Sequence, residues 1–122
     1  MQQFQDLKVL DLTDNRLGNR GAIEICNLIK ETKTIQTLIL QKNRIGPSGL
    51  SHICSAMTYN QSIKVLDIRD NMIQDESLKT LLAMLYINEV ILQIKYTVTN
   101  EENIRRIQQF EENKHLTVEE IE

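Results

Sequence analysis

The sequence predicts an α/β solenoid in which strand-helix units stack side by side, with a parallel sheet on the inner curve and helices outside. Two observations predict this fold. The chain has a 28-residue period, the separation of Asn15 from Asn43 and of Asn43 from Asn71, and within each unit the spacing of apolar residues changes from that of a strand to that of a helix. One strand and one helix cannot bury both of their apolar faces alone, so neighbouring units must cover each other.

The strand half of the unit is present in three copies. They run Leu7-x-x-Leu10-x-Leu12-x-x-Asn15-x-Leu17, then Ile35-x-x-Leu38-x-Leu40-x-x-Asn43-x-Ile45, then Ile63-x-x-Leu66-x-Ile68-x-x-Asn71-x-Ile73. Apolar residues alternate at period 2 in each copy, which predicts a short strand. Each copy therefore contributes one strand followed by a loop with an Asn in a fixed place.

The second half of each unit has helical periodicity. Ala22, Ile25, Cys26 and Ile29 fall at i, i+3, i+4 and i+7, which form one face of an amphipathic helix. The two regular units also carry a pair of glycines before the helix, which we attribute to chain reversal and close helix approach: Gly18 and Gly21, then Gly46 and Gly49. The third unit keeps the apolar spacing and loses both glycines.

These in-phase copies resemble the ribonuclease-inhibitor-like class of leucine-rich repeat, which implies a short segment of a right-handed α/β horseshoe. The predicted domain spans residues 7–113, with repeats at about 7–34, 35–62 and 63–90 and an irregular closing unit at 91–113. Residues 1–6 are expected to form a short lead-in and residues 114–122 an acidic C-terminal tail. The closing unit either ends the stack or precedes further repeats beyond His115.

The closing unit departs from the repeat. Ile94 and Tyr96 follow Leu66 and Ile68 by one full period, but Thr99 stands where the Asn is expected. The segment 99–102 resembles a helix start, because its acidic residues would face the positive end of the helix dipole. The helix is expected to bury a stripe formed by Ile104, Ile107 and Phe110.

Charge and hydropathy exclude several classes of partner. The net charge is -3, so nothing suggests general attraction to nucleic acid or to an anionic membrane. Residues 99–122 carry seven acids and three bases, or -4, which leaves +1 for residues 1–98. The prediction against nucleic acid therefore rests on the mixed charges of the repeats. The longest apolar run, residues 81–87, is too short to span a bilayer, and residues 1–6 do not form a secretory signal.

The residues that invite a chemical role have structural explanations, so we expect no enzyme activity, cofactor or metal. Cys26 and Cys54 occupy the same helical position in neighbouring units, where Leu82 stands in the third, and are interpreted as buried free thiols. His52 lies two residues before Cys54 and points elsewhere on the helix. The acidic positions led by Asp11 and Asp67 lack the Gly and Glu of a calcium loop and are expected to face solvent.

The asparagines are predicted to form a structural ladder, Asn15, Asn43 and Asn71, whose amides satisfy backbone groups where strand passes into loop. Side chains that point away from the core are expected to form the protein-binding inner curve. These are Val9, Asp11, Thr13, Thr37, Ile39, Gln41, Val65, Asp67, Arg69, Gln93, Lys95 and Thr97. A rim beside them is formed by Arg16, Lys42, Arg44 and Asp70. The mixture of apolar and oppositely charged groups suits a protein partner.

We therefore predict a non-enzymatic interaction or scaffold module, cytoplasmic and not secreted, for example one segment of a cytoskeletal or ciliary assembly. The N-terminal edge is expected to be open and to pack on a neighbour. The resemblance implies a second function, because Ran GTPase-activating proteins share this repeat, although no functional residue of theirs can be matched here. Relatives in the class also include tropomodulin-like actin-filament cappers and the ligand-sensing regions of NOD-like receptors.

Overall fold

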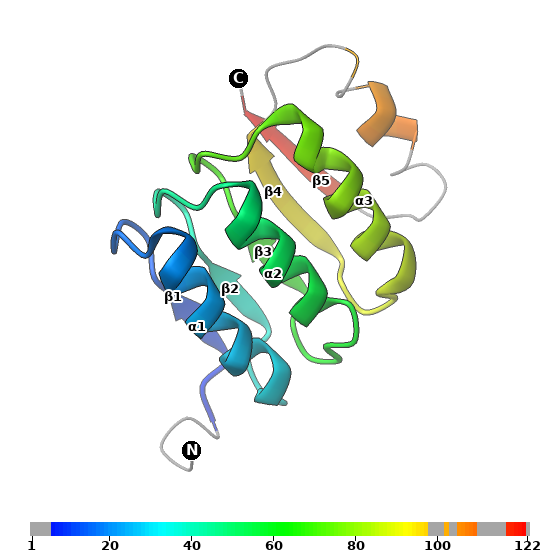
Figure 1. Ribbon diagram of the computed structural model, residues 1–122. Coiled ribbons are helices and arrows are strands. Elements are labelled where there is room, and N and C mark those ends of the chain that lie inside the picture. Colours follow the sequence, from blue (N-terminus) through cyan, green and yellow to red (C-terminus); the bar gives the residue numbers. More distant parts are fainter. Residues whose placement is uncertain (1–5, 98–101, 103–104, 110–116, 122) are drawn as a thin grey trace.

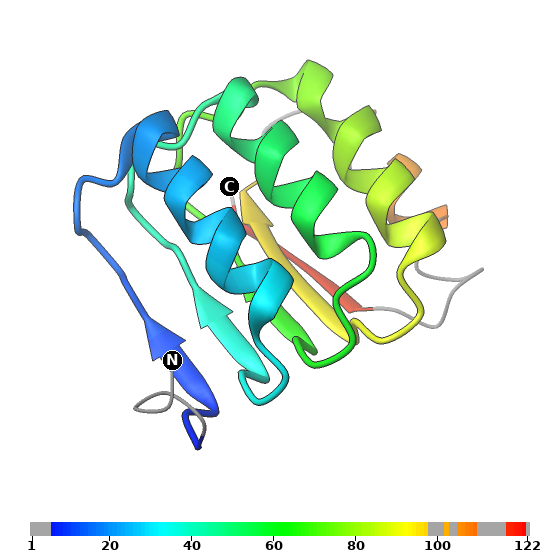
Figure 2. The ribbon, with the colours of Figure 1, turned by 60° about the horizontal axis from the view of Figure 1, so that its bottom comes forward.

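The structure has two layers, a parallel sheet and a row of helices that covers one of its faces (Figures 1 and 2). It is a computed structural model that describes residues 6–97, 102, 105–109 and 117–121. Within these ranges the sheet has the order β1 (Val9–Asp11), β2 (Thr37–Ile39), β3 (Val65–Asp67), β4 (Gln93–Thr97) and β5 (Thr117–Ile121). The helices are α1 (Gly18–Glu31), α2 (Pro47–Met57) and α3 (Leu78–Ile87), the last preceded by a 3₁₀ turn, η2 (Asp75–Ser77). The predicted solenoid is confirmed.

The strand register reproduces the sequence period. Leu10 lies opposite Leu38, Leu38 opposite Leu66, and Leu66 opposite Ile94. These strand side chains pack against the apolar faces of the helices. The residues buried between the two layers include Leu38, Leu66, Ile94, Ala22 and Ile29. Burying such side chains contributes about 1.5–3 kcal/mol for each large aliphatic group.

The predicted asparagine ladder joins adjacent units through backbone groups that no strand can satisfy. The Asn43 amide is fully buried. Its oxygen accepts from the backbone N–H of Asn15 (2.8 Å) and Leu17 (3.3 Å), and its Nδ2 donates to the carbonyls of Leu12 (2.8 Å) and Gln41 (3.2 Å). Asn71 repeats the pattern one unit later. Asn15 is exposed and donates only within its own loop, to Leu12 and Thr13, because no unit precedes it among the described residues.

A second ladder, which was not predicted, joins the units where each helix returns to the next strand. Buried Asn60 donates to the carbonyl of Ile29 (2.8 Å) and accepts from the backbone of Ser62 and Ile63. Asn88 does the same one unit later, donating to the carbonyl of Met57 (2.7 Å). Thr32 stands one period before Asn60, and its hydroxyl accepts from Ile35 (3.1 Å). The repeated spacing was a readable signal, obscured by the Thr in the first unit.

The helix pair α1 and α2 packs more closely than the pair α2 and α3, and Gly46 and Gly49 explain the close packing of the first pair. The Asn19 side-chain oxygen accepts from the backbone N–H of both Gly46 and Gly49 (2.8 Å each), so α1 caps the start of α2. A Cβ on Gly49 would lie 2.6 Å from that oxygen and 3.0 Å from the Cβ of Ala22. Ser77 takes the place of Gly49 in the third unit, and α3 begins only after η2. As a result, α2 and α3 pack less closely than α1 and α2.

The C-terminal region differs from the expected acidic tail. β5 pairs in parallel with β4 from Gln93↔Thr117 to Thr97↔Ile121, so residues within 114–122 extend the sheet. The β-branched residues Thr117, Val118 and Ile121 favour an extended chain. In the closing unit, β4 and a helical segment at 105–109 are present, and Ile107 is buried as expected. Residues 99–101, Ile104 and Phe110 lie outside the described residues.

The N-terminal edge is less well covered than the middle of the stack. Its core side chains are only partly buried, whereas their equivalents in the next unit are at most 1% exposed: Leu7, Leu10, Leu12 and Leu17 against Ile35, Leu38, Leu40 and Ile45. The difference arises because β1 has a strand neighbour on one side only within the described sheet.

Asn43→Ala is expected to lower the free energy of unfolding by about 1–3 kcal/mol, because it leaves buried backbone groups without partners. Asn15→Ala is the matched control and should cost about 0.5 kcal/mol or less, since that side chain is exposed. Urea denaturation followed by circular dichroism measures both. Equal losses in the two variants would contradict the ladder.

Gly49→Ala should destabilise the chain by about 1–3 kcal/mol, because the new methyl group meets the α1 side chains at less than van der Waals distance. Ser48→Ala, at the exposed neighbouring position, should have little effect. Adding Asn19→Ala removes the 2.6 Å contact, so the double variant should lose less stability than the sum of its single changes. Strict additivity in thermal melts would show that Asn19 and Gly49 do not interact.

Candidate functional site

The inner curve is formed by the strand side chains that face away from the helices. The register places Val9, Thr37, Val65 and Gln93 in one column and Asp11, Ile39, Asp67 and Lys95 in the next. Thr13, Gln41, Arg69 and Thr97 follow two residues along the chain. The backbone of β5 pairs with β4, with Thr117 opposite Gln93 and Glu119 opposite Lys95. The structure therefore brings the twelve predicted positions together on one face of the sheet.

Among the inner-curve side chains that the structure describes, those of β1 are the most exposed. Val9 is 54% exposed, and Asp11 is also exposed. The Thr13 hydroxyl and backbone N–H both donate to the Asp11 carboxylate, and these hydrogen bonds hold the pKa of Asp11 below its usual value. Asp11 is thus a charged acceptor group beside an exposed apolar side chain.

The prediction that the Asp67 carboxylate faces solvent is wrong. It is 3% exposed because the Arg69 side chain lies over it. The Arg69 guanidinium donates to both carboxylate oxygens, from Nε to Oδ1 (3.0 Å) and from Nη2 to Oδ2 (2.8 Å). Such a two-point pair satisfies both charges with each other. Asp67 therefore has a structural role, and at this position Arg69 is the more accessible of the two side chains.

The middle of the inner curve is half-buried and mostly uncharged. Thr37, Ile39, Gln41, Val65, Gln93, Lys95 and Thr97 all have partly exposed side chains. Gln41 Nε2 donates to the Asp70 carboxylate (3.1 Å), and the Asp70 backbone N–H donates to the Thr97 hydroxyl (3.0 Å). These bonds tie the inner curve to the rim.

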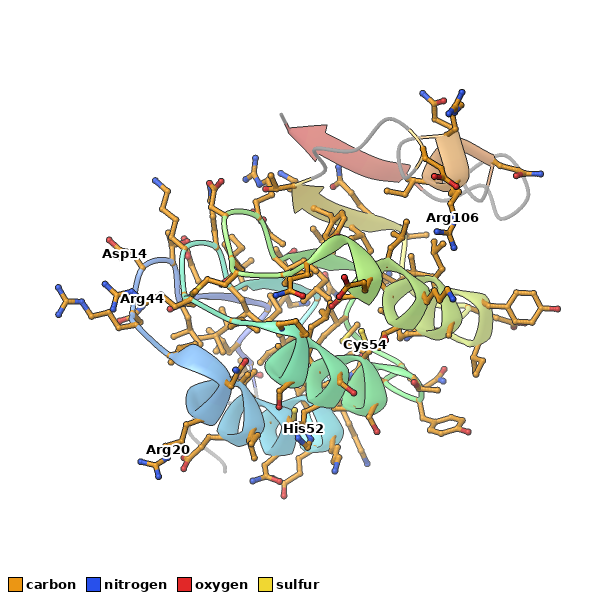
Figure 3. All side chains as sticks on the ribbon, turned by 45° about the horizontal axis from the view of Figure 1, so that its top comes forward. Asp14, Arg20, Arg44, His52, Cys54 and Arg106 are labelled. Atoms are coloured by element: carbon orange, nitrogen blue, oxygen red, sulfur yellow. The ribbon has the colours of Figure 1, made fainter. Side chains whose placement is uncertain are left out.

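The rim residues share an unusual backbone conformation. Arg16, Lys42, Arg44 and Asp70 are all exposed, and all have φ between 54° and 59°, as does Asp14 at 56°. The left-handed region costs roughly 1–2 kcal/mol for an L-residue other than Gly, and Arg and Lys have no special preference for it. These residues flank the ladder asparagines, so the turn that directs each amide inward directs the neighbouring charges outward. Figure 3 shows Asp14 and Arg44 at this edge.

The two cysteines are free and buried, as predicted. Burial raises the pKa of the Cys54 thiol to about 12, with a further contribution from Cys26, and burial also raises the pKa of Cys26. His52 is exposed and points to a different side of α2 from Cys54 (Figure 3). In the part of the chain that the structure describes, no group of three His, Cys, Asp or Glu side chains could hold a metal ion. No helix among those residues is long and apolar enough to cross a bilayer.

The fold and the inner curve define a repeat solenoid, and comparison with known families identifies which kind. A family model described as "Leucine Rich repeat" matches residues 5–26, 33–54 and 59–82. The chain belongs to the leucine-rich-repeat family, whose members are typically protein-interaction modules.

Among solved structures, the chain is similar to "Leiomodin-1 Actin-Binding Site 2 (ABS2)", with a TM-score of 0.83 and 12% sequence identity. The match covers 97% of this chain and 72% of that one. At this identity the similarity concerns the fold. No curated protein sequence matches the chain.

Both thiols should react only slowly with Ellman's reagent in the native protein at pH 8, because they are 6% and 3% exposed and burial keeps them protonated. Both should react rapidly in denaturant. In the pH range from about 9 to 12 the unfolded Cys54 ionises while the folded one does not. Stability should therefore fall as pH rises through this range. A thiol that reacts rapidly in the native protein would contradict the burial.

Proposed function

We propose that the chain is a non-enzymatic protein-binding module whose inner curve and rim form the docking surface. The observation that carries the proposal is that these side chains contribute little to the core and yet gather on one face. The exposed pair Val9 and Asp11 lies on the same face as half-buried Ile39 on β2 and Val65 on β3. The rim adds Arg16, Lys42, Arg44 and Asp70. Apolar groups interspersed with both signs of charge suit a protein surface better than a polyanion or a lipid.

The size of this face favours a partner that also contacts the rim. Five strands at about 4.8 Å spacing span roughly 19 Å. A standard interface uses about 20–30 residues on each side, and the predicted inner curve supplies twelve. The outward-pointing rim charges enlarge the same surface, because the bonds from Gln41 to Asp70 and from Asp70 to Thr97 hold the two regions together.

The ribonuclease-inhibitor-like subtype is part of the proposal. It is supported by the 28-residue period and by an α-helix in each of the first three units. A cytoplasmic location is supported by the two free, buried cysteines, since reducing compartments preserve such thiols. The half-buried leucines of the N-terminal edge support a neighbouring polypeptide there, as a second contact region.

A cytoskeletal partner is the first to test, because one of the similar solved structures is an actin-binding site of leiomodin-1. The chain is expected to bind actin in co-sedimentation and in anisotropy assays. Val9→Asp combined with Asp11→Arg should weaken that binding about tenfold or more, by placing a charge at the apolar position and reversing the adjacent one.

Glu24→Lys, on the exposed surface of α1, is the matched control and should leave actin binding unchanged. Circular dichroism should show all variants folded. Loss of binding in the control but not in the double variant would move the interface to the helices. No actin binding by the wild-type chain would overturn actin as the partner.

A further inference from the structure

A groove lies between α2 and α3 on the helical face, away from the inner curve. Its volume is about 460 Å³, and it is open to solvent. Buried Cys54 and Met84 form its floor. The walls are small side chains, Ser51, Ser55 and Thr58 on the α2 side and Thr80 and Ala83 on α3.

The groove follows from the irregular third unit. Where Gly49 and the Asn19 cap bring α1 and α2 together, Ser77 and η2 delay the start of α3. The side chains on the α2 side of the groove are also short. Ser51, Ser55 and Thr58 occupy the positions at which α1 has the longer Ile23, Asn27 and Lys30. Late helix start and small side chains together leave the space.

The ends of the groove differ in chemistry. At one end Lys79, in the first turn of α3, is the charged lining residue, and a cation there is unfavourable to the helix dipole. At the other end the lining residue Ile87 is 52% exposed. Neither α2 nor α3 has a basic residue in its last turn, so neither helix supplies a cation at the negative end of its own dipole.

We propose that this groove binds an amphipathic helix of a partner protein, lying parallel to α2 and α3. The wall from Ser51 to Thr58 covers about 10 Å of helix, which matches apolar anchors at i, i+4 and i+7 of the incoming helix. An acidic first turn of the incoming helix pairs with Lys79, and its basic last turn lies beside Ile87, at the negative ends of the α2 and α3 dipoles. The same charge placement stabilises the dipole of the incoming helix itself, which is why the parallel orientation is favoured.

The test uses a fluorescein-labelled peptide of about four helical turns with Glu in its first turn, Leu at the three anchor spacings and Lys in its last turn. Anisotropy titration should show saturable binding to the full chain. A charge-inverted peptide with the same leucines should bind about fivefold more weakly or worse. Ala83→Phe fills the groove and should weaken binding about tenfold or more, whereas His52→Phe, on α2 outside the groove, should not.

Lys79→Glu is a second test, because it leaves the shape of the groove unchanged and reverses the charge at one end of it. It should weaken the original peptide and tighten the charge-inverted one, while Lys30→Glu on α1 should change neither. No binding of the original peptide, or no switch with Lys79→Glu, would overturn the proposal. Concentration-dependent dimerisation abolished by Ala83→Phe in sedimentation equilibrium would assign the groove to a second copy instead. The Val9→Asp and Asp11→Arg double variant should retain peptide binding, which separates this site from the inner curve.

Discussion

The structure depends on the buried amide of Asn43. A solenoid must turn its chain sharply after every strand, and that turn leaves backbone donors and acceptors away from water, where each unsatisfied group costs about 1–3 kcal/mol. One Asn side chain satisfies four of them, three in the preceding unit and one in its own. The 28-residue period is therefore a hydrogen-bonding requirement as much as a packing one. Asn60 and Asn88 meet the same requirement where each helix returns to the sheet.

The same turns create the rim. For Asn43 to point inward, Lys42 and Arg44 on either side of it take left-handed backbone conformations. Glycine would adopt these conformations with less strain, so the chain carries charged side chains where a purely structural turn would favour none. Strain held at exposed charged positions is a reason to connect the rim with binding. One loop therefore holds both the amide that stabilises the stack and the exposed charges of the proposed docking surface.

Periodicity predicted what every unit shares, and it failed where units differ. The strand register, the helix faces and the Asn43 ladder all follow from spacing. The burial of Asp67 does not, because the equivalent Asp11 is exposed. β3 has strands on both sides and Arg69 nearby in sequence, whereas β1 has one neighbour and Thr13. β5 escaped detection because Val118 pairs opposite Ile94 at a separation shorter than the repeat period. A repeat pattern describes local geometry, while exposure depends on neighbours in space.

Departures from the repeat also decide where the helical layer can bind. In a regular solenoid each helix covers the next, and the outer face offers little depth. Here Asn19 and Gly49 produce that close cover once, between α1 and α2. In the third unit Ser77 occupies the position of Gly49, α3 begins later, and a groove with an apolar floor lies between α2 and α3. The inner curve belongs to the sheet and the groove to the helical layer, so the two proposed docking surfaces share no side chains. The second of them depends on the irregular start of α3 in the third unit.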